Sequence, residues 1–329
     1  MRPSAPILAA IVSLGMMLTG FAPQPPQPVD DPEALLNLDA DAHAVEELVV
    51  RPPGPAWWTV SSGGRNVYIL GILTAYPTAE KWNQTGLDRR LDKSDRVLTQ
   101  PIISNPSSAR LQGTAAKALP PSLAAQISAA ATRHGAPPSR YLDRSAIEAG
   151  ALLLLDFEKS LGAERQVIAA AVSERAKAKG RKVVSSGVIL TANYLADVEN
   201  APVETQKACL DAAIDEVDHG AAPLRAAFEG WSRGDVRAAL GAPRGMELCQ
   251  FSIPGQANMR RKSNEIQATA VAKFLQQDVP RGVVDGQKSN GDTARVDAIA
   301  LINLRSLLAV GGVLDQLRAK GFDIDAPQF

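Results

Sequence analysis

The residues WWTVSSGGRNVYILGILTAYP, Trp57–Pro77, set out the beginning of a β-sheet. Two apolar runs that end at Val60 and Leu70 flank the turn sequence Ser-Ser-Gly-Gly, which predicts two antiparallel strands joined as a hairpin. Gly71 closes the second run, and Thr74 follows shortly before a turn proline. Glycine at a strand end, then a small polar residue and a turn, is a common way to build a site at a sheet edge. We therefore look for a functional site near Thr74.

Helical and strand patterns follow along the rest of the chain. Apolar spacing, starting prolines and closing glycines predict helices at 85–95, 120–135, 144–162, 163–180, 204–231, 257–277 and 307–321. Short apolar runs predict strands at 95–100, 181–187, 295–304 and 322–325. We expect an α/β fold with a mixed β-sheet core, a large helical insertion and helices packed around it. One domain should cover residues 56–329.

The N-terminus is typical of an exported protein. Arg2 precedes an apolar run, Ile7–Phe21, and Ala22 leads into a proline-rich stretch. This pattern predicts a signal peptide over residues 1–22 that is cleaved near Ala22. A retained anchor is the alternative, but the run is shorter than the roughly 18–20 residues that a span needs. We expect a periplasmic or secreted protein without a membrane span in the mature chain, preceded by a proline-rich, acidic lead over residues 23–55.

Charge and cysteine content narrow the function classes. The 35 basic and 35 acidic residues balance, which argues against nucleic acid or an anionic membrane surface as the main partner. An alanine-rich chain with 5% aromatic residues suggests a bacterial source. Cys209 and Cys249 lie in the exported part, where an even pair predicts a disulfide bond. Two buried free thiols are the alternative.

Histidines offer little for catalysis. The chain has three, of which His43 lies in the lead, while His134 and His219 stand at expected helix ends. The dipole of a helix favours histidine at its C-terminus without any function. The acidic residues of Asp211–His219 could in principle bind a metal through carboxylates spaced by one helical turn. A solvated helix face explains this pattern more simply.

Several blocks, in this order, resemble the TraB/GumN family, whose Tiki branch is regarded as metal-dependent proteases. These blocks are the opening stretch, LDRRLDKSDRVLTQP (87–101), WSRGDV (231–236) and GGVLDQLRAKGFDI (311–324). The resemblance runs from about residue 57 to residue 325. It implies the mixed α/β scaffold of that family for nearly the whole mature chain.

The resemblance also places the family's site residues. Active-looking members carry Gly-x-x-His after a strand, a glutamate at the end of the next strand, another glutamate after a third, and a second Gly-x-x-His near the C-terminus. Here Gly71 is kept, but Thr74 stands in place of the first histidine. Gln100 replaces the first glutamate, and no acid occurs near Gly187, where the second falls. Ser306 replaces the last histidine.

These replacements change the chemistry that the resemblance implies. Imidazole and carboxylate groups bind divalent cations, whereas hydroxyl and amide groups are weak, neutral donors. We therefore expect no cofactor, no bound metal and no catalytic residues, and a neutral polar pocket at the former metal site. Its residues would be Thr74, Gln100, Ser186, Gly187, Asn303 and Ser306, with Arg305 at the rim.

Such a pocket would hold a small carboxylate, a sugar or a peptide end. The family that the chain resembles includes a protein encoded among polysaccharide-synthesis genes, and the resemblance therefore also implies an envelope or polysaccharide-related role. One alternative is a divergent metal-dependent hydrolase or peptidase that binds a divalent metal through other ligands. Another is a purely structural protein that binds a partner.

Overall fold

The computed structural model describes residues 54–104, 119–190, 198, 200–253, 255–277 and 297–328. Contacts divide the chain into residues 1–31 and residues 32–329, and every described residue belongs to the second unit. The expected signal peptide, nearly all of the lead and His43 therefore lie outside the described residues.

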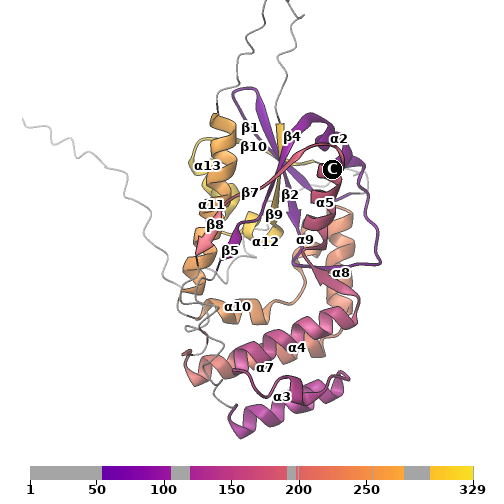
Figure 1. Ribbon diagram of the computed structural model, residues 1–329, viewed down its shortest axis with the longest axis vertical. Helices are drawn as coiled ribbons and strands as arrows, with labels where there is room; N and C mark the ends of the chain where they lie inside the picture. Colours follow the sequence, from indigo (N-terminus) through magenta and orange to yellow (C-terminus); the bar gives the residue numbers. More distant parts are fainter. Residues whose placement is uncertain are drawn as a thin grey trace, which may run out of the picture. The chain divides into compact units, whose positions relative to one another are not determined.

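A six-stranded mixed sheet forms the centre of the fold, in the order β10-β1-β2-β9-β4-β7 (Figure 1). Its strands are β1 (Trp57–Ser62), β2 (Arg65–Ile72), β4 (Ser94–Thr99), β7 (Lys182–Ser185), β9 (Asp297–Asn303) and β10 (Asp323–Gln328). Strand β1 runs antiparallel to both β2 and β10. Strands β2, β9, β4 and β7 run parallel to one another. The carboxyl ends of these four parallel strands consequently meet at one edge of the sheet.

The β1–β2 hairpin is formed as the sequence predicts. Trp57 pairs with Leu70, and Ser62 pairs with Arg65 across a two-residue turn. Gly63 and Gly64 both have positive φ, 56° and 80°, which a two-residue hairpin turn of this kind requires and glycine adopts without strain.

Helices cover both faces of the sheet. In Figure 1, α11 (Gln256–Gln276) and α13 (Val313–Ala319) lie on one side, and α2 (Thr85–Lys93) and α5 (Val167–Ala178) lie on the other. The inner strands β2 and β9 are buried along nearly their whole length, as is usual for parallel strands covered on two faces. The short helices α8 (Ala222–Ser232), α9 (Val236–Leu240) and α12 (Leu304–Leu308) pack near the carboxyl edge.

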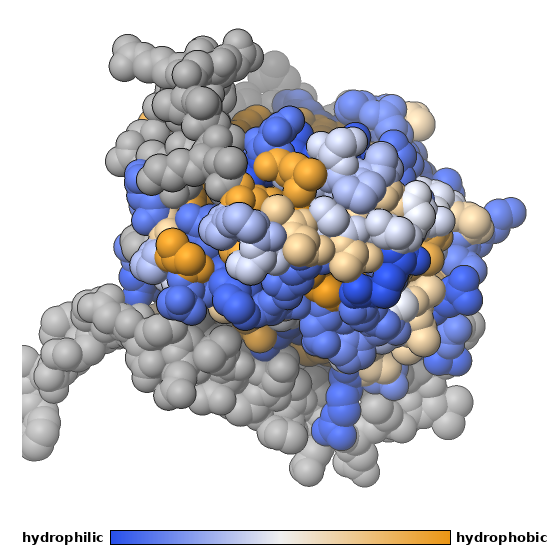
Figure 2. Space-filling view, turned by 90° about the horizontal axis from the view of Figure 1, so that it is seen from below, coloured by the Kyte–Doolittle hydropathy of each residue, from blue (hydrophilic) through white to orange (hydrophobic). Residues whose placement is uncertain are grey.

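A separate helical layer has a hydrophobic core of its own. It consists of α3 (Pro121–Arg133), α4 (Ala146–Ser160), α7 (Val203–Asp218) and α10 (Gly245–Phe251). Leu153 on α4 and Leu210 on α7 are fully buried in this core, together with Tyr141. Helices α4 and α7 pack closely at Gly150, where an added Cβ would lie 2.9 Å from the Cβ of Ala213. Figure 2 shows the outer face of this layer, where hydrophilic residues surround small groups of apolar ones. This layer is the helical insertion that the sequence predicts.

The remaining short elements are β3 (Ala75–Pro77), β5 (Ile102–Ser104), β6 (Ala163–Arg165), β8 (Val188–Leu190) and the 3₁₀ helix η3 (Pro138–Arg140). Three predicted helices are shorter or divided. Residues 163–165 form strand β6 against β3 rather than the start of α5. The helix expected over 204–231 breaks at Gly220, whose positive φ of 75° ends α7 before α8 begins. The helix expected over 307–321 is divided at Gly311, which also has positive φ.

A disulfide bond joins two helices of the helical layer. Cys209 on α7 and Cys249 on α10 are bonded, with their Cα atoms 5.2 Å apart and a sequence separation of 40. The pairing agrees with the sequence expectation. It fastens α10 to α7, whose side chains also meet around Met246 in a small apolar cluster.

We predict that Cys209→Ala with Cys249→Ala lowers the free energy of unfolding by about 3–4 kcal/mol, because the bond restrains a long loop of the unfolded chain. Urea unfolding measures the change. Reducing agent should lower the stability of the wild-type protein by a similar amount and leave the double variant unaffected. Equal stability of the oxidised wild type and the double variant would contradict the prediction.

A buried carboxylate fixes the amino ends of β2 and β9. Asp297 is only 2% exposed. It accepts hydrogen bonds from the backbone N–H of Asn66, 3.0 Å, and from the hydroxyl of Tyr68, 2.9 Å. Burial, together with the hydrogen bond and charge of Asp297, raises the pKa of Tyr68 to about 12. This network links the first residue of β9 to the start of β2, beside the parallel backbone pairing of the two strands.

Removing that carboxylate should destabilise the fold strongly. Asp297→Ala leaves a partly buried backbone N–H and a partly buried hydroxyl group without their acceptor, so we expect a loss of about 2–4 kcal/mol in the free energy of unfolding. Asp95→Ala is the matched control, because Asp95 forms a partly exposed ion pair with Arg96. It should cost less than about 1 kcal/mol. Similar losses for the two variants would show that the network contributes little.

Candidate functional site

The positions singled out in the sequence follow the carboxyl ends of the parallel strands. Thr74 lies just after β2, Gln100 just after β4 and Ser186 just after β7, while Asn303 is the last residue of β9. Strand β9 lies between β2 and β4 in the sheet. In open α/β sheets, ligands bind in the crevice outside the carboxyl ends of the strands. The topology thus brings distant parts of the chain to the edge where a site is expected.

Asn303 links three backbone segments at this edge. Its Nδ2 donates a hydrogen bond of 2.9 Å to Oγ1 of Thr74, which connects the ends of β9 and β2. Its Oδ1 accepts the backbone N–H groups of Arg305, 3.1 Å, and Ser306, 3.2 Å, and so caps the first turn of α12. Both polar atoms of the amide are therefore engaged within the protein. Ser306 itself is buried, with 7% of its surface exposed.

Arg305 connects the sheet edge to the loop after α9. Its Nη2 donates to the carbonyl oxygens of Leu240 and Ala242, each at 2.7 Å. The guanidinium group thereby holds the chain that leads into α10 against the start of α12. Arg305 therefore has a structural role in addition to its place at the expected site.

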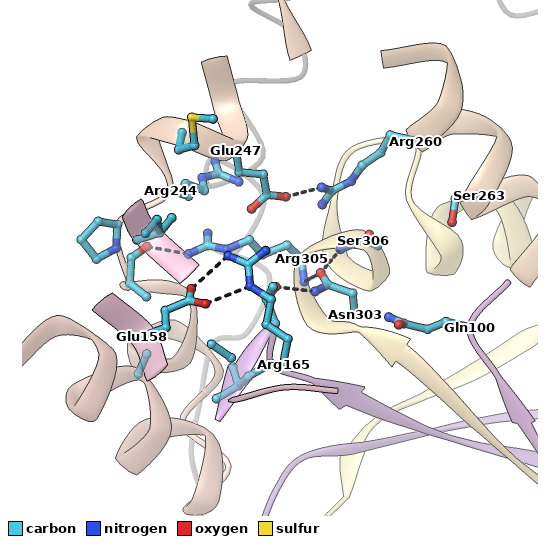
Figure 3. A pocket seen from close by; sticks show the side chains of 18 of the residues that line it. Gln100, Glu158, Arg165, Arg244, Glu247, Arg260, Ser263, Asn303, Arg305 and Ser306 are labelled. Atoms are coloured by element: carbon cyan, nitrogen blue, oxygen red, sulfur yellow. Dashed lines mark hydrogen bonds and ion pairs between the residues drawn. The ribbon is translucent and has the colours of Figure 1, made fainter. Parts of the chain in front are cut away.

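A cavity of about 430 Å³ opens between this edge and the helical layer, and we call it the central cavity (Figure 3). Five residues of the expected site line it, namely Thr74, Gln100, Asn303, Arg305 and Ser306. Among the described residues, it is also lined by three glutamates, Glu158, Glu216 and Glu247, and by three further arginines, Arg165, Arg244 and Arg260. The expected neutral pocket is therefore only one part of a larger, charged cavity.

Two ion pairs organise the charged part. Arg165 on β6 binds Glu158 of α4 through Nε at 2.8 Å and Nη2 at 3.2 Å, the two-point geometry that suits guanidinium and carboxylate (Figure 3). Arg260 of α11 is paired with Glu247 of α10. Burial tends to lower the pKa of Arg165, but the hydrogen bond and charge of Glu158 outweigh it and raise that pKa above its ordinary value.

Glu216 is the third carboxyl group of the central cavity. It accepts the backbone N–H of Met246 at the start of α10. Burial raises its pKa, and the negative charges of Glu158 and Glu247 add to this effect. The hydrogen bond from Met246 and the charge of Arg165 oppose it without cancelling it.

Helix α11 supplies one wall of the cavity through Arg260, Ser263 and Gln267. Their spacing of three and four residues places them on one face of the helix. Gln267 is only 4% exposed, and its Nε2 donates to the carbonyl oxygen and Oγ of Ser263, both at 3.3 Å. Within the described part of the chain, its Oε1 has no hydrogen-bond partner. The helical spacing of these three polar residues is the sequence pattern from which this wall of the cavity could have been predicted.

Other expected site residues lie elsewhere. Gly71 packs inside the protein, where its carbonyl accepts the indole N–H of Trp231 at 2.6 Å and an added Cβ would lie 2.5 Å from Leu304. Ser186 and Gly187 line a second cavity, of about 550 Å³, between the end of β7 and α11. The structure thus groups five of the expected residues and places these three apart from them.

The donor groups at the sheet edge do not fit a catalytic divalent metal. They are the hydroxyl groups of Thr74 and Ser306 and the amide groups of Gln100 and Asn303, beside the cationic Arg305. Protein sites for zinc and related metals use imidazole, thiolate or carboxylate ligands instead. In the part of the chain that the structure describes, no group of three or more His, Cys, Asp or Glu residues is arranged to hold a metal.

His134, His219 and the aspartates Asp211, Asp215 and Asp218 are not among the residues that line the central cavity, whereas Glu216 of the same stretch is. His134 and His219 are the C-terminal capping residues of α3 and α7, as the sequence predicts. His134 lies 2.9 Å from a carboxylate oxygen of Asp218, which also pairs with Arg133. Asp211 pairs with Lys207 one turn earlier on α7. The ion pair between Arg133 and Asp218 joins α3 to α7, whereas the pair between Lys207 and Asp211 lies within α7.

Comparison with known proteins gives one match. The model of a family described as the TraB/PrgY/gumN family matches residues 56–326. No curated protein and no solved structure matches the chain significantly. Among the described residues, no helix combines the length and apolar character needed to cross a membrane.

Variants can separate the two roles of Asn303, the cap of α12 and the link to Thr74. Asn303→Ala removes the cap of α12 and the link to Thr74, so we expect the free energy of unfolding to fall by about 1–2 kcal/mol. Asn303→Asp keeps the capping oxygen, and its second carboxylate oxygen can accept a hydrogen bond from the Thr74 hydroxyl in place of the amide donor, so it should cost less than about 0.5 kcal/mol. Thr74→Val removes the hydroxyl and should cost about 0.5–1 kcal/mol. Thermal and urea unfolding of the three variants test this order, which an Asn303→Ala protein of wild-type stability would contradict.

Proposed function

This chain belongs to the TraB/PrgY/gumN family, and from that membership we propose that it is an exported, non-catalytic member that binds a small polar ligand in the central cavity. Family membership accounts for the scaffold. The residues at the carboxyl edge of the sheet distinguish this chain from the metal-dependent members that it resembles.

The hydrogen bond between Asn303 and Thr74 carries this proposal. Thr74 stands where the resemblance places a metal-binding histidine, and its hydroxyl oxygen accepts a hydrogen bond from the amide of Asn303 rather than offering a strong metal ligand. The amide oxygen is occupied by the cap of α12. The positive charge of Arg305, in the same cavity, would also oppose a bound cation. A metal would have to displace these groups and would gain only weak, neutral ligands.

The cavity suits a small molecule in size and chemistry. Its volume of about 430 Å³ lies within the usual range for ligand pockets. The hydroxyl and amide groups that line it can form hydrogen bonds with a small carboxylate, a sugar or a peptide end. If the N-terminal segment acts as an export signal, such a ligand is met in the periplasm or outside the cell. A role in the envelope or in polysaccharide metabolism is consistent with that setting.

Metal analysis of the purified mature protein tests the non-catalytic part of the proposal. After dialysis we expect no stoichiometric zinc, manganese or cobalt, and no peptidase activity that a chelator abolishes. A tightly held divalent ion, or chelator-sensitive turnover, would overturn it. Thr74→Ala with Ser306→Ala tests the binding part: it should weaken ligand binding, whereas a purely structural role predicts no effect.

A hydrolase is the second candidate, and the observation that favours it is the carboxyl group of Glu216. Its raised pKa and its position beside Glu158 and Glu247 resemble the environments that prepare a carboxyl group for acid–base work. Hydrolysis of peptide or glycoside substrates that Glu216→Gln abolishes, with binding retained, would establish this candidate. An absence of turnover in the wild-type protein would exclude it for the substrates tested.

A further inference from the structure

We propose that the outer edge of β7 and β8, together with α11, binds an acidic segment of a partner protein as an additional β-strand. The groove beside this edge shares no lining residue with the central cavity, so the inference does not depend on the ligand proposed there. It follows from three features of the described residues, namely an open strand edge, an apolar groove and positive charge without an ion pair.

The first feature is the open side of β7. Among the described strands, β7 is outermost in the sheet and pairs with β4 alone. The backbone N–H of Ser186 donates to the carbonyl oxygen of Thr99 on β4 at 3.0 Å. Backbone groups of successive residues point alternately to the two sides of a strand, and those of Val183 and Ser185 therefore point away from β4. The backbone of a further strand can pair with them.

The second feature is the cavity of about 550 Å³ between this edge and α11, which we call the outer groove (Figure 1). An added Cβ at Gly187 would lie 2.6 Å from Ile266, so the end of β7 is held close to the helix. Leu98 and Val188 line the groove, and Val184 lies on the same face as Leu98, with which it pairs. Both valines are exposed, and an apolar side chain of an added strand would cover them.

The apolar surface continues onto the two-stranded sheet of β5 and β8. Ile102 on β5 pairs with Val188, and Leu190 lies two residues further along β8 on the same face. Val188 is 54% exposed and Leu190 is 72% exposed. Large apolar side chains that gather on an exposed surface mark sites where another molecule binds. An extended segment that runs along β7 and β8 would remove these side chains from water.

The third feature is positive charge at one end of the outer groove. Lys182 begins β7, and the position opposite it on β4 is Arg96, whose guanidinium group lies 5.2 Å from the centre of the Phe274 ring. The residue before Phe274 is Lys273, which lines the groove. Lys182 and Lys273 are exposed, and neither forms an ion pair with a described residue. The other charged residues of the lining are paired, Lys262 with Glu265 and Arg96 with Asp95.

These features together specify the chemistry of the partner. The open edge selects an extended backbone, because only a further strand satisfies a row of backbone donors and acceptors. The apolar side chains along β7 and β8 select apolar residues at alternate positions of that strand. Two positive charges without ion pairs, Lys182 and Lys273, select acidic residues at one end of it. A second copy of this chain suits the edge less well, because the same lysines would face one another.

Labelled pentapeptides test the inference on the mature protein. Glu-Glu-Val-Thr-Val carries acidic groups at one end and alternate apolar groups, and Val-Thr-Val-Glu-Glu is its reverse. Fluorescence anisotropy should show binding of at least one of them, according to the direction of the added strand. The same peptides with lysine in place of glutamate should bind about tenfold more weakly, because Lys182 and Lys273 repel them. Binding of neither acidic peptide, or equal binding of the lysine peptides, would overturn the proposal.

Backbone methylation separates strand pairing from adhesion to an apolar surface. An N-methyl group removes one backbone donor of the peptide and leaves its side chain unchanged. Only alternate N–H groups of a paired strand face the neighbouring strand. Of two versions of the acidic peptide, methylated at the second and fourth residues or at the third and fifth, one should lose at least tenfold in affinity and the other should keep it. Equal effects of the two would contradict an added strand.

A charge reversal tests the two lysines. Lys182→Glu with Lys273→Glu should invert the preference, so that the lysine peptide binds more tightly than the acidic one. Lys81→Glu with Lys320→Glu is the matched control, because it makes the same change in net charge at exposed positions that do not line the outer groove. The control should keep the wild-type preference. Loss of the fold cannot invert a preference, and an unchanged preference in the first variant would overturn the proposal.

A photoreactive p-benzoylphenylalanine at position 184 identifies the occupant of the outer groove. After illumination, mass spectrometry should find the added acidic peptide joined to this position. A crosslink to residues 23–53 of the same chain would assign the groove to the lead, and a crosslink between two copies would assign it to a dimer. Either of these results, in place of the peptide, would overturn the proposal of a partner protein.

Discussion

The site depends on one side chain, Asn303, placed where the central strand β9 gives way to α12. Its amide joins the end of β9 to Thr74 after β2 and caps the helix that carries Arg305 and Ser306. A single side chain therefore fixes both the shape of the sheet edge and the direction of the next segment. An amide can do this because it has a donor at one end and an acceptor at the other. A histidine or a carboxylate aimed at a metal could not serve both neighbours in this way.

The charged part of the cavity is added by segments far away in sequence. Arg305 holds the loop after α9, and this loop leads into α10, which carries Glu247. Helix α10 is fastened to α7 by the disulfide bond and by the hydrogen bond from Met246 to Glu216. The sheet edge is thus connected through Arg305, α10 and the disulfide bond to α7, the helix that carries Glu216. Ligand recognition and the stability of the helical layer should be coupled through this connection.

Much of the scaffold could be predicted from the sequence. Strand β2 is a continuous apolar run after a Ser-Ser-Gly-Gly turn, and Pro121 and Gly135 bracket α3, so these local patterns fix their elements directly. Asn303, Thr74 and Gln100 were also identified as neighbours, through the family resemblance. Glu158, Glu216 and Arg260 were not, because each has the pattern of an ordinary helical surface and only tertiary packing turns it toward the cavity. Gly187 was grouped with the site, although packing against Ile266 places it in another cavity.

Anomalous X-ray diffraction from crystals of the mature protein, grown with manganese and zinc ions present, tests the central claim most directly. The account predicts no anomalous signal within coordination distance of Thr74 Oγ1, with the amide of Asn303 still donating to that oxygen. A metal peak at this position, with the amide turned away and Gln100 or Ser306 as a ligand, would contradict it.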